Sequence, residues 1–512
     1  MKTIVRGRSL IKRAVDRYSV EEIHNGALLQ ENGVIKAIDT FAKLREEYPD
    51  AEVIGSGNEI VIPGFVNAHH HVGLTPVQLG SKDMPLELWW ITRMVFRDID
   101  IYLDTLYSAF EMIASGVTTV QHLHGWIPGT PEHLLAKSTE VLKAYQDIGM
   151  RASYSYTVRD QNRLMYQPDE ALTAALPPEL QGPMKAWFAR FKTDLNASMQ
   201  LFRQLYDTYH SDGKIKIQLA PANLHWCTDE ALEAFSETSK KYNVPIHMHL
   251  VETAYQKEYA KRRGGGSAVD YLDRFDLLSP RMTLGHGTWL SEKDIEHVAS
   301  KGVCVCHNCS SNFRLRSGIA PLNAFEAHGV NTGIGMDEAG INDDRDMLQE
   351  MRLVLRAHRV PGMVDDDVPT TAQVFRMATS GGARTTAFAD SIGTLEVGKA
   401  ADLVLLDWDQ IAYPYLDQDT STIDALIQRA KTQGVKLTMC GGEVLYQDGE
   451  FTKVNRAEVL KQIHEKLNVP LTEAELARRA LSKGILPYIR DFYKDYFDKA
   501  SHEPFYRMNS RV

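Results

Sequence analysis

The chain has 512 residues, of which 44% are hydrophobic and 24% charged, and this composition predicts a soluble globular protein with room for one large and one smaller domain. The formal net charge of -10 argues against a nucleic-acid partner, because neutralising phosphates requires a basic surface. Five cysteines are too few for a disulfide framework and no apolar run is long enough to cross a bilayer, so we expect a cytoplasmic protein with no membrane partner.

Two stretches that lie far apart in the sequence are rich in short strands and turns. Residues 1–62 contain "GALLQENGVIKAI", in which an ENG turn signal separates two apolar runs, and residues 391–455 contain "GTLEVGKAADLVLLDWD". We expect these two stretches to pair into one small β-domain. Charges run through the opening "MKTIVRGRSLIKRAVDR", where a signal peptide has its apolar core, so no signal peptide is expected.

Between these stretches, residues 63–390 alternate strand-like runs with helix-like spacers, and residues 456–512 have the pattern of charged helices packed outside. Several runs are apolar and end in polar residues, which is typical of a buried parallel strand whose tip carries function. Counted from residue 61, the eight runs are "VIPGFVNAHHH", "GVTTVQHLH", "MRASYSYTVRD", "KIKIQLAPANLHW", "VPIHMHLVET", "RMTLGHGTW", "GVCVCHNCSSN" and "VNTGIGMDEAG". They predict an α/β fold with a (β/α)8 TIM-like barrel, where chemistry lies at the carboxyl ends of the strands.

Histidines and carboxylates gather at these strand tips. Side chains alternate between the faces of a strand, so His69 and His71 project to one side and His70 to the other. His247 and His249 share a face in the same way, and periodicity alone leaves open which of the two is a ligand. The other candidates at the same mouth are Glu252, His286 and Asp337. Singly, each is an ordinary polar residue or helix cap, but together they predict a metal site.

Five motifs, in this order, resemble the metal-dependent amidohydrolase superfamily: "PGFVNAHHH", "HMHLVET", "LGHGT", "HNCSSNFRLRSGIAPL" and "GIGMDEAG". The resemblance is to its mononuclear aminohydrolase branch, which includes adenosine-analogue, guanine, cytosine and triazine deaminases and triazine chlorohydrolases. It covers nearly the whole chain. It implies a metal-binding barrel at 63–390, a small β-sandwich built from 1–62 and 391–455, and a helical extension at 456–512.

The resemblance also implies a ligand set. The implied metal ligands are His69, His71, His249 and Asp337. His249 is preferred to His247 because the family places its catalytic glutamate three residues after the ligand, where Glu252 stands. Three imidazoles and a carboxylate suit zinc, and also iron, manganese or nickel. One ion is expected rather than two, because a binuclear site needs a bridging ligand, and the strand-four tip "LAPANLHW" offers no lysine.

By the same resemblance, three residues carry the catalysis. Glu252 would protonate a ring nitrogen of the substrate, His286 would contact the hydrolytic water, and Asp337 would take a proton from that water as it attacks. The implied reaction is hydrolytic deamination of an aminated nitrogen heterocycle, such as a purine, pterin or triazine. The alternative reactions are dechlorination or dealkylamination of a heteroaryl ring and amide or urea hydrolysis. The alternative that is not an enzyme is a catalytically inactive binding protein.

Substrate contacts are predicted from residues at or just after strand ends and from the loop "SKDMPLELWWITRMVF" after strand one. The candidates are Trp89, Trp90, His122, Arg159, His225, His307 and Arg314. A place in the core is an equally open interpretation for the two tryptophans, and a structural salt bridge is one for Arg159, His225, His307 and Arg314. His122 has a second interpretation, in which it orients a ligand histidine. Cys304 and Cys306 are expected to be buried small hydrophobes rather than part of a zinc cluster. The expected partners are a small-molecule substrate and a second copy of the chain, as a homodimer or higher homo-oligomer.

Overall fold

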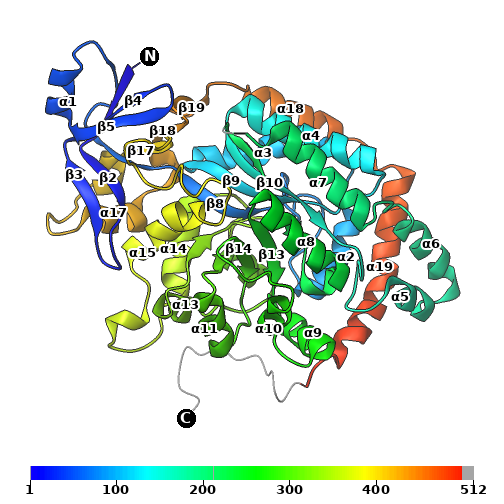
Figure 1. Ribbon diagram of the computed structural model, residues 1–512. Helices are drawn as coiled ribbons and strands as arrows, with labels where there is room; N and C mark the ends of the chain where they lie inside the picture. Colours follow the sequence, from blue (N-terminus) through cyan, green and yellow to red (C-terminus); the bar gives the residue numbers. More distant parts are fainter. Residues whose placement is uncertain (1, 212, 499–512) are drawn as a thin grey trace.

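Two parallel sheets form the centre of the molecule, and the computed structural model describes residues 2–211 and 213–498 (Figure 1). The first sheet has the order β11-β10-β9-β8, with β12 paired to β10, and the second has the order β13-β14-β15-β16. The strands of the first sheet are β8 (Phe65–His70), β9 (Val117–His124), β10 (Arg151–Val158), β11 (Ile215–Ile217) and β12 (Ala220–Pro221). Those of the second are β13 (Ile246–Leu250), β14 (Met282–His286), β15 (Cys304–His307) and β16 (Thr332–Ile334).

Parallel bridges outside the named strands join these two sheets at both edges. Leu219 bridges to Ile246 and Asn223 to His249 at one edge, and His70 bridges to Asp337 at the other. The strands are buried on both faces: every residue of β9 and of β13 is buried. The predicted α/β class with parallel strands is therefore confirmed, and the carboxyl ends of the first and last strands lie next to each other.

The predicted strand "VIPGFVNAHHH" is wrong as a single element, because Gly64 divides it. The segment before this glycine belongs to β7 (Glu59–Pro63), which pairs with β17 (Leu403–Asp407) in an antiparallel ladder, whereas β8 pairs with β9. A Cβ at Gly64 would lie 2.2 Å from Oγ1 of Thr118, so the chain passes too close to its neighbour for any other residue. After the break, His69 and His70 end β8 and His71 follows directly.

Two further sheets contain the strand-rich stretches from both ends of the sequence (Figure 1). One has the order β5-β4-β1-β6, and the other has the order β20-β19-β18-β17-β7-β2-β3. The remaining strands are β1 (Lys2–Arg6), β2 (Ser9–Ala14), β3 (Val20–His24), β4 (Gly26–Glu31), β5 (Val34–Thr40), β6 (Glu52–Ile54), β18 (Val435–Cys440), β19 (Glu443–Gln447) and β20 (Glu450–Phe451). A buried cluster that includes Val5 and Leu28 from one sheet and Val61 and Leu405 from the other lies between them.

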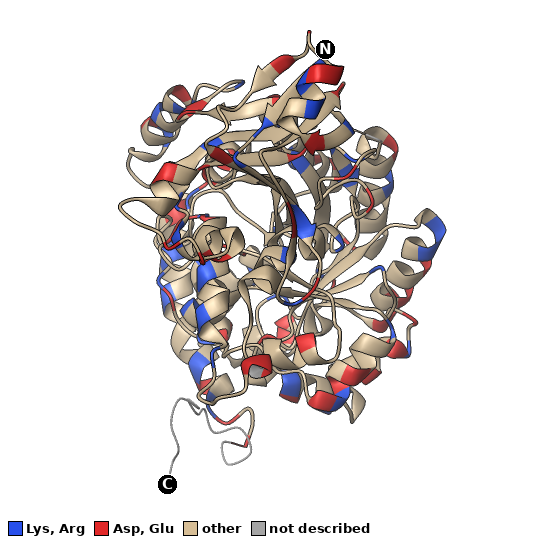
Figure 2. Ribbon diagram, turned by 90° about the vertical axis from the view of Figure 1, so that its left-hand side faces the viewer, with Lys and Arg blue, Asp and Glu red and all other residues tan. Residues whose placement is uncertain are grey.

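Helices surround the parallel strands, and Lys and Arg are interspersed with Asp and Glu along them (Figure 2). The α-helices are α1 (Phe41–Glu47), α2 (Leu86–Thr92), α3 (Ile101–Ala114), α4 (Pro131–Ile148), α5 (Asp169–Ala175), α6 (Pro178–Phe188), α7 (Leu195–Tyr209), α8 (Asp229–Tyr242), α9 (Ala254–Gly264), α10 (Ala268–Asp273), α11 (Glu292–Ser300), α12 (Cys309–Arg314), α13 (Leu322–Ala327), α14 (Met347–Ala357), α15 (Thr371–Arg376), α16 (Trp408–Ala412), α17 (Thr422–Arg429), α18 (Arg456–Leu467) and α19 (Glu473–Lys494). Across the described ranges, none of them has the length and apolar character that a membrane span requires.

The last helix, α19, packs on α2 and on the following short helix η1 (Arg93–Val95) (Figure 1). Thr472 and Glu475 close its first turn with a capping box, which satisfies backbone N–H groups there. Its apolar residues join those of α2 in one buried cluster, and Ser482 Oγ donates a hydrogen bond to the carbonyl of Ile91 at 3.0 Å. The predicted helical tail is found as far as the structure describes it; residues 499–512 lie outside the described part.

Candidate metal centre and substrate cavity

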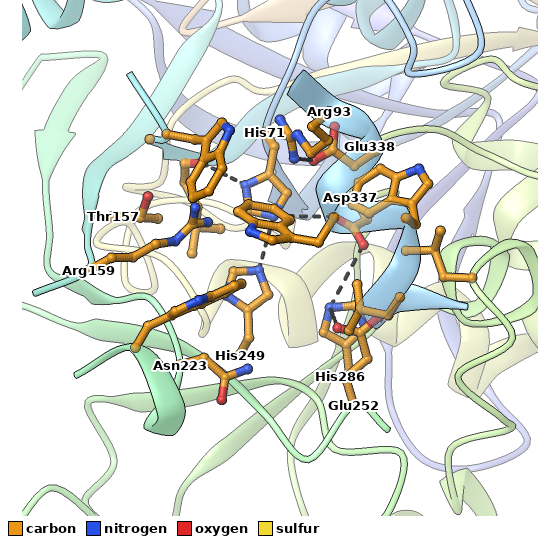
Figure 3. A pocket seen from close by; sticks show the side chains of 18 of the residues that line it. His71, Arg93, Thr157, Arg159, Asn223, His249, Glu252, His286, Asp337 and Glu338 are labelled. Carbon is orange, nitrogen blue, oxygen red and sulfur yellow. Dashed lines mark hydrogen bonds and ion pairs between the residues drawn. The ribbon is translucent and has the colours of Figure 1, made fainter. Parts of the chain in front are cut away.

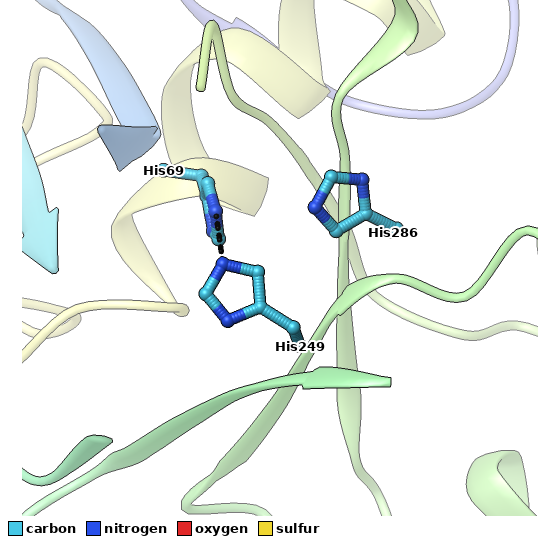
Figure 4. A group of neighbouring side chains, drawn as sticks. All are labelled: His69, His249 and His286. Carbon is cyan, nitrogen blue, oxygen red and sulfur yellow. Dashed lines mark hydrogen bonds between the residues drawn. The ribbon is translucent and has the colours of Figure 1, made fainter. Parts of the chain in front are cut away.

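Three imidazole nitrogens converge at the carboxyl ends of β8 and β13. Nε2 of His69 lies 3.0 Å from Nε2 of His71 and 3.1 Å from Nε2 of His249, and the last two are 3.1 Å apart. Oδ1 of Asp337 lies 3.2 Å from Nε2 of His71 and 3.6 Å from Nε2 of His69. Figure 4 shows His69 and His249 facing each other, with His286 on a neighbouring strand. Four potential ligand atoms from three strands therefore surround one point.

The opposite nitrogen of each ring has a hydrogen-bond partner that fixes its orientation. Nδ1 of His71 lies 2.6 Å from the carbonyl oxygen of Leu123, and Nδ1 of His249 lies 2.6 Å from that of Ala222. Nδ1 of His69 lies 2.9 Å from Nε2 of His247. Because a carbonyl only accepts, His71 and His249 each carry a proton on Nδ1 and turn their Nε2 atoms to the centre.

The electrostatics of the cluster suit a cation. Burial, followed by the neighbouring His71, holds the pKa values of His69 and His249 well below the usual histidine value, so both rings are neutral. Burial raises the pKa of Asp337, but the hydrogen bond and charge of His71 outweigh it, and the net pKa lies below the usual range. Burial lowers the pKa of His71, but the hydrogen bond and charge of Asp337 outweigh it, so the net pKa of this ring is raised. Divalent metal sites use neutral imidazoles and an ionised carboxylate, so an ion at this point would take the place of the proton between His71 and Asp337, and these residues fit such an ion.

Two further groups lie beside this cluster. Nε2 of His286 is 3.8 Å from Oδ2 of Asp337 and 3.6 Å from Oε2 of Glu252. Burial raises the pKa of Glu252 to about 7, so at neutral pH this carboxyl group is partly protonated. Ser317 Oγ donates a hydrogen bond to Glu252 Oε1 at 3.0 Å, and Ser311 Oγ donates one to Asp337 Oδ2 at 2.6 Å. The site thus combines an ionised carboxylate with a second carboxyl group that can donate a proton.

Backbone strain is concentrated around the same point. Val251, His286 and Asp337 have φ values of 42°, 71° and 51°, in the left-handed region that non-glycine residues rarely adopt. Each follows or ends a strand of the second parallel sheet. Such conformations cost of order 1–3 kcal/mol and persist only where the surroundings enforce them, typically at functional sites.

We expect His247→Ala to weaken metal binding by about 10- to 100-fold, because it removes the partner that orients His69 while leaving the three convergent nitrogens in place. The measurement is a competition titration of the metal against a chelator. His124→Ala is the matched control, since His124 is also a buried strand histidine but is bonded to Tyr154, at 2.6 Å. Equal affinities for the two variants would show that His247 does not support the site.

A cavity adjoins the metal cluster (Figure 3). It is lined by His71, His249 and Asp337 from the cluster and by Glu252 and His286 beside it. Of the seven predicted substrate contacts, the structure brings Trp89, Trp90 and Arg159 to this cavity. Its other lining residues include Arg93, Trp126, Asn223, Trp226, Gln256 and Glu338. The cavity therefore has largely aromatic walls on one side and the candidate metal centre on the other.

The other four predicted contacts do not line this cavity, because each is held elsewhere. His122 lies inside β9, with Nδ1 2.8 Å from the Tyr145 hydroxyl and Nε2 3.0 Å from the carbonyl of His71. Nε2 of His307 is 2.8 Å from Nε2 of His358. The ring of His225 lies against that of Tyr166, with the centroids 4.2 Å apart and the planes tilted by 46°. Arg314 forms an ion pair with Asp343 at 2.8 Å. His122 contacts the backbone of His71 next to the metal cluster, and a role in orienting a ligand histidine stays a prediction.

Several residues at the site were not predicted. Asn312 Oδ1 lies 2.9 Å from Nδ1 of His286 and Asn308 Nδ2 lies 3.2 Å from its Nε2, so the two asparagines hold this ring with Nε2 as an acceptor. Both belong to the motif "HNCSSN", and its polar residues are the sequence feature from which a role at the site could have been predicted. Arg93 forms an ion pair with Glu338 and comes from the helical segment after "LWW". No sequence pattern marked this arginine as a site residue.

The chain belongs to the amidohydrolase family, whose family model matches residues 60–445. It is therefore a hydrolase that acts on carbon–nitrogen bonds, and the resemblance seen in the sequence motifs is confirmed. It is 30% identical over 458 residues to a 5-methylthioadenosine/S-adenosylhomocysteine deaminase from Pyrococcus furiosus, covering 88% of this chain and 98% of that one. A 5'-deoxyadenosine deaminase from Methanopyrus kandleri is 28% identical over 449 residues, covering 86% of this chain and 94% of that one.

Solved structures share the fold. An adenosine deaminase from Xanthomonas campestris with bound zinc superposes with a TM-score of 0.75 at 23% identity, covering 94% of this chain and 98% of that one. An atrazine chlorohydrolase from Arthrobacter aurescens, complexed with zinc, superposes with a TM-score of 0.77 at 21% identity, covering 90% of this chain and 99% of that one. At these identities the likeness concerns the fold alone.

Proposed function

We propose that this chain is a zinc-dependent deaminase that replaces the amino group of an aminated nitrogen heterocycle with oxygen. The observation that carries the proposal is the convergence of three Nε2 atoms within 3.1 Å of one another beside a buried carboxyl group with a pKa of about 7. The two curated relatives named above are deaminases of adenine-containing compounds by their names, which favours a purine among the candidate rings.

The proposal includes an assignment of fold and domains. The parallel bridges at both edges of the two central sheets support a closed (β/α)8 barrel over residues 63–390. The buried cluster shared by the other two sheets supports a β-sandwich built from 1–62 and 391–455, followed by the helical extension from 456. All five cysteines are free thiols, which supports a reducing, cytoplasmic location. Assembly into a homo-oligomer stays a prediction.

In this proposal, His69, His71, His249 and Asp337 hold a single zinc ion. The chemistry that a divalent ion would supply in such a site is acidification of a water, whose pKa falls to roughly 7. A single ion agrees with the residues at the centre, where Asp337 is the carboxylate nearest to the three nitrogens in the described chain.

The chain's own residues then divide the proton transfers. Asp337, ionised through its contact with His71, accepts a proton from the attacking water, and His286, whose Nε2 faces both carboxyl groups, orients that water. Glu252 donates a proton to a ring nitrogen, so the attacked carbon becomes more electrophilic. Water adds to this carbon, the carbon–nitrogen bond breaks, and the departing amine takes up a proton and leaves as ammonia.

The first test is ammonia release by zinc-loaded protein from a panel of amino-purines, amino-pterins, amino-pyrimidines and amino-triazines, with chloride release followed on chlorinated triazines. Ammonia from one ring class supports the proposal and identifies the ring. Release of chloride without ammonia would indicate dechlorination instead of deamination. Release of neither product by metal-loaded protein would favour amide or urea cleavage.

The pH dependence is expected to show a falling limb above about pH 7. Burial raises the Glu252 pKa to about 7, and this carboxyl group must be protonated to act as the donor, so kcat/KM decreases as pH rises through that value. The measurement is kcat/KM from pH 5.5 to 9 on the best panel substrate at constant metal loading. A rate that increases steadily to pH 9 would rule out Glu252 as the proton donor.

A further inference from the structure

His307, Cys309 and His358 form a second group of potential metal ligands, outside the candidate metal centre described above. One ring nitrogen of each histidine and Sγ of the cysteine lie within 4.8 Å of one another. His307 ends β15, Cys309 begins α12 and His358 directly follows α14, so segments 51 residues apart in the sequence supply the group. None of the three side chains is more than 4% exposed. Two imidazoles and a thiol at buried positions are ligands typical of structural zinc sites.

The hydrogen bonds of the protein leave this group incompletely satisfied. Nε2 of His307 lies 2.8 Å from Nε2 of His358, so one ring donates its N–H to the other. Nδ1 of His307 is closed to solvent and has no hydrogen-bond partner among the described residues. Buried polar atoms are seldom left in this state, which indicates that the histidine pair by itself is not the complete arrangement.

The charges around the group suit a cation with a thiolate ligand. Burial holds the pKa of His307 well below the usual histidine value and lowers the pKa of His358 to about 4, so both rings are neutral, the form that binds metals. Burial raises the pKa of the Cys309 thiol, and the carboxyl group of Glu350 raises it further, so this thiol keeps its proton until an ion displaces it. The same buried carboxyl group would add negative charge near a bound cation.

The spacing of the histidines is close to that of a tetrahedral zinc site. Zn–N bonds of about 2.0–2.1 Å place two imidazole nitrogens about 3.3 Å apart around one ion. The Nε2 atoms of His307 and His358, at 2.8 Å, need to separate by only roughly 0.5 Å to reach that value. The Nε2 atoms of the candidate metal centre are similarly close, at 3.0–3.1 Å.

We propose that His307, Cys309 and His358 bind a second metal ion, zinc or another thiophilic divalent ion, at a structural site separate from the candidate metal centre. A thiolate ligand favours such ions over magnesium, calcium or manganese. The ion would join the segment at the β15–α12 junction to the end of α14. That segment includes Asn308, whose Nδ2 lies 3.2 Å from Nε2 of His286. The inference does not depend on the proposed deamination, because none of the three ligands lines the substrate cavity.

The test uses Co²⁺ as a probe, because a thiolate bound to this ion gives a charge-transfer absorption band in the near ultraviolet, whereas imidazole and carboxylate ligands do not. The full chain is stripped with a chelator, reloaded with Zn²⁺ or Co²⁺ and passed through gel filtration. The wild type should retain about two ions per chain and show the band. His249→Ala, which disrupts the candidate metal centre, should retain about one ion and the full band.

Two variants remove ligands of the proposed second site. Cys309→Ser should retain about one ion and lose the band. His358→Asn keeps the thiol but should also lose the second ion and the band, so the inference stays testable if Cys309→Ser does not fold. Cys306→Ser is the matched control, because Cys306 is equally buried and also lies near two histidines, but outside this group. It should keep both ions and the band.

Three results would overturn the inference. The first is a wild type that retains one ion per chain and shows no band, whatever the variants do. The second is a second ion without the band, which would place that ion away from Cys309. The third is a band that survives in Cys309→Ser or His358→Asn, or that Cys306→Ser abolishes.

Discussion

His249→Ala is expected to reduce metal affinity by more than about 100-fold and to leave the candidate metal centre of the purified protein largely free of metal. His249 supplies one of three Nε2 atoms that lie within 3.1 Å of one another, and the loss of a mere supporting residue typically costs 10- to 100-fold. The neighbouring His247 cannot replace it, because its Nε2 is bonded to Nδ1 of His69 on the far side of that ring. The measurement is the metal content of the His249→Ala protein after gel filtration.

His133→Ala is the control for this experiment, since His133 is an exposed histidine on α4. Thermal melting of both variants in the presence of chelator shows whether the apo-proteins are folded. Full metal content in a folded His249→Ala protein would remove His249 from the ligand set and return His247 to consideration.

Glu252→Gln is expected to keep the metal and to lose turnover by about 10²- to 10⁴-fold, the usual contribution of a positioned general acid. The amide has the shape of the carboxyl group and can still interact with Ser317, which bonds to Oε1 at 3.0 Å, but it has no acidic proton to transfer. The two measurements are metal stoichiometry and kcat on the best substrate of the panel.

Glu237→Gln, on the exposed face of α8, is the matched control and should retain full activity. A Glu252→Gln enzyme with near-normal kcat would exclude the proposed acid role. A variant that also lost its metal would show that Glu252 supports the metal centre rather than the proton transfer.

The parallel strands of the fold followed from one sequence pattern. Apolar runs that end in polar residues predicted the parallel strands, because strands buried on both faces are predominantly apolar. The division at Gly64 could not be predicted in this way, since the residues on both sides are apolar and buried. It arises because β7 and β8 pair with different partners, and a change of partner leaves no trace in hydrophobicity.

Strand periodicity placed His247 and His249 on one face but did not separate them; the preference for His249 came from the family resemblance. Two residues correspond to roughly 6.6 Å along a strand, so Nε2 of His249 lies beside the Nε2 atoms of His69 and His71, whereas Nε2 of His247 contacts Nδ1 on the far side of His69. Trp126 and Trp226 line the cavity from outside the parallel strands. Their positions depend on tertiary packing, which local sequence patterns do not record.

The packing of α19 on α2 has a consequence for the order in which the cavity is completed. Ser482 and Ile91, which are joined by a hydrogen bond, are separated by 391 residues, so a ribosome needs roughly 20 to 80 s between them. During that interval the apolar surface of α2, which includes Trp89 and Trp90, lacks the helix that covers it. The surface of α2 that faces the cavity is therefore completed only after α19 has been synthesised.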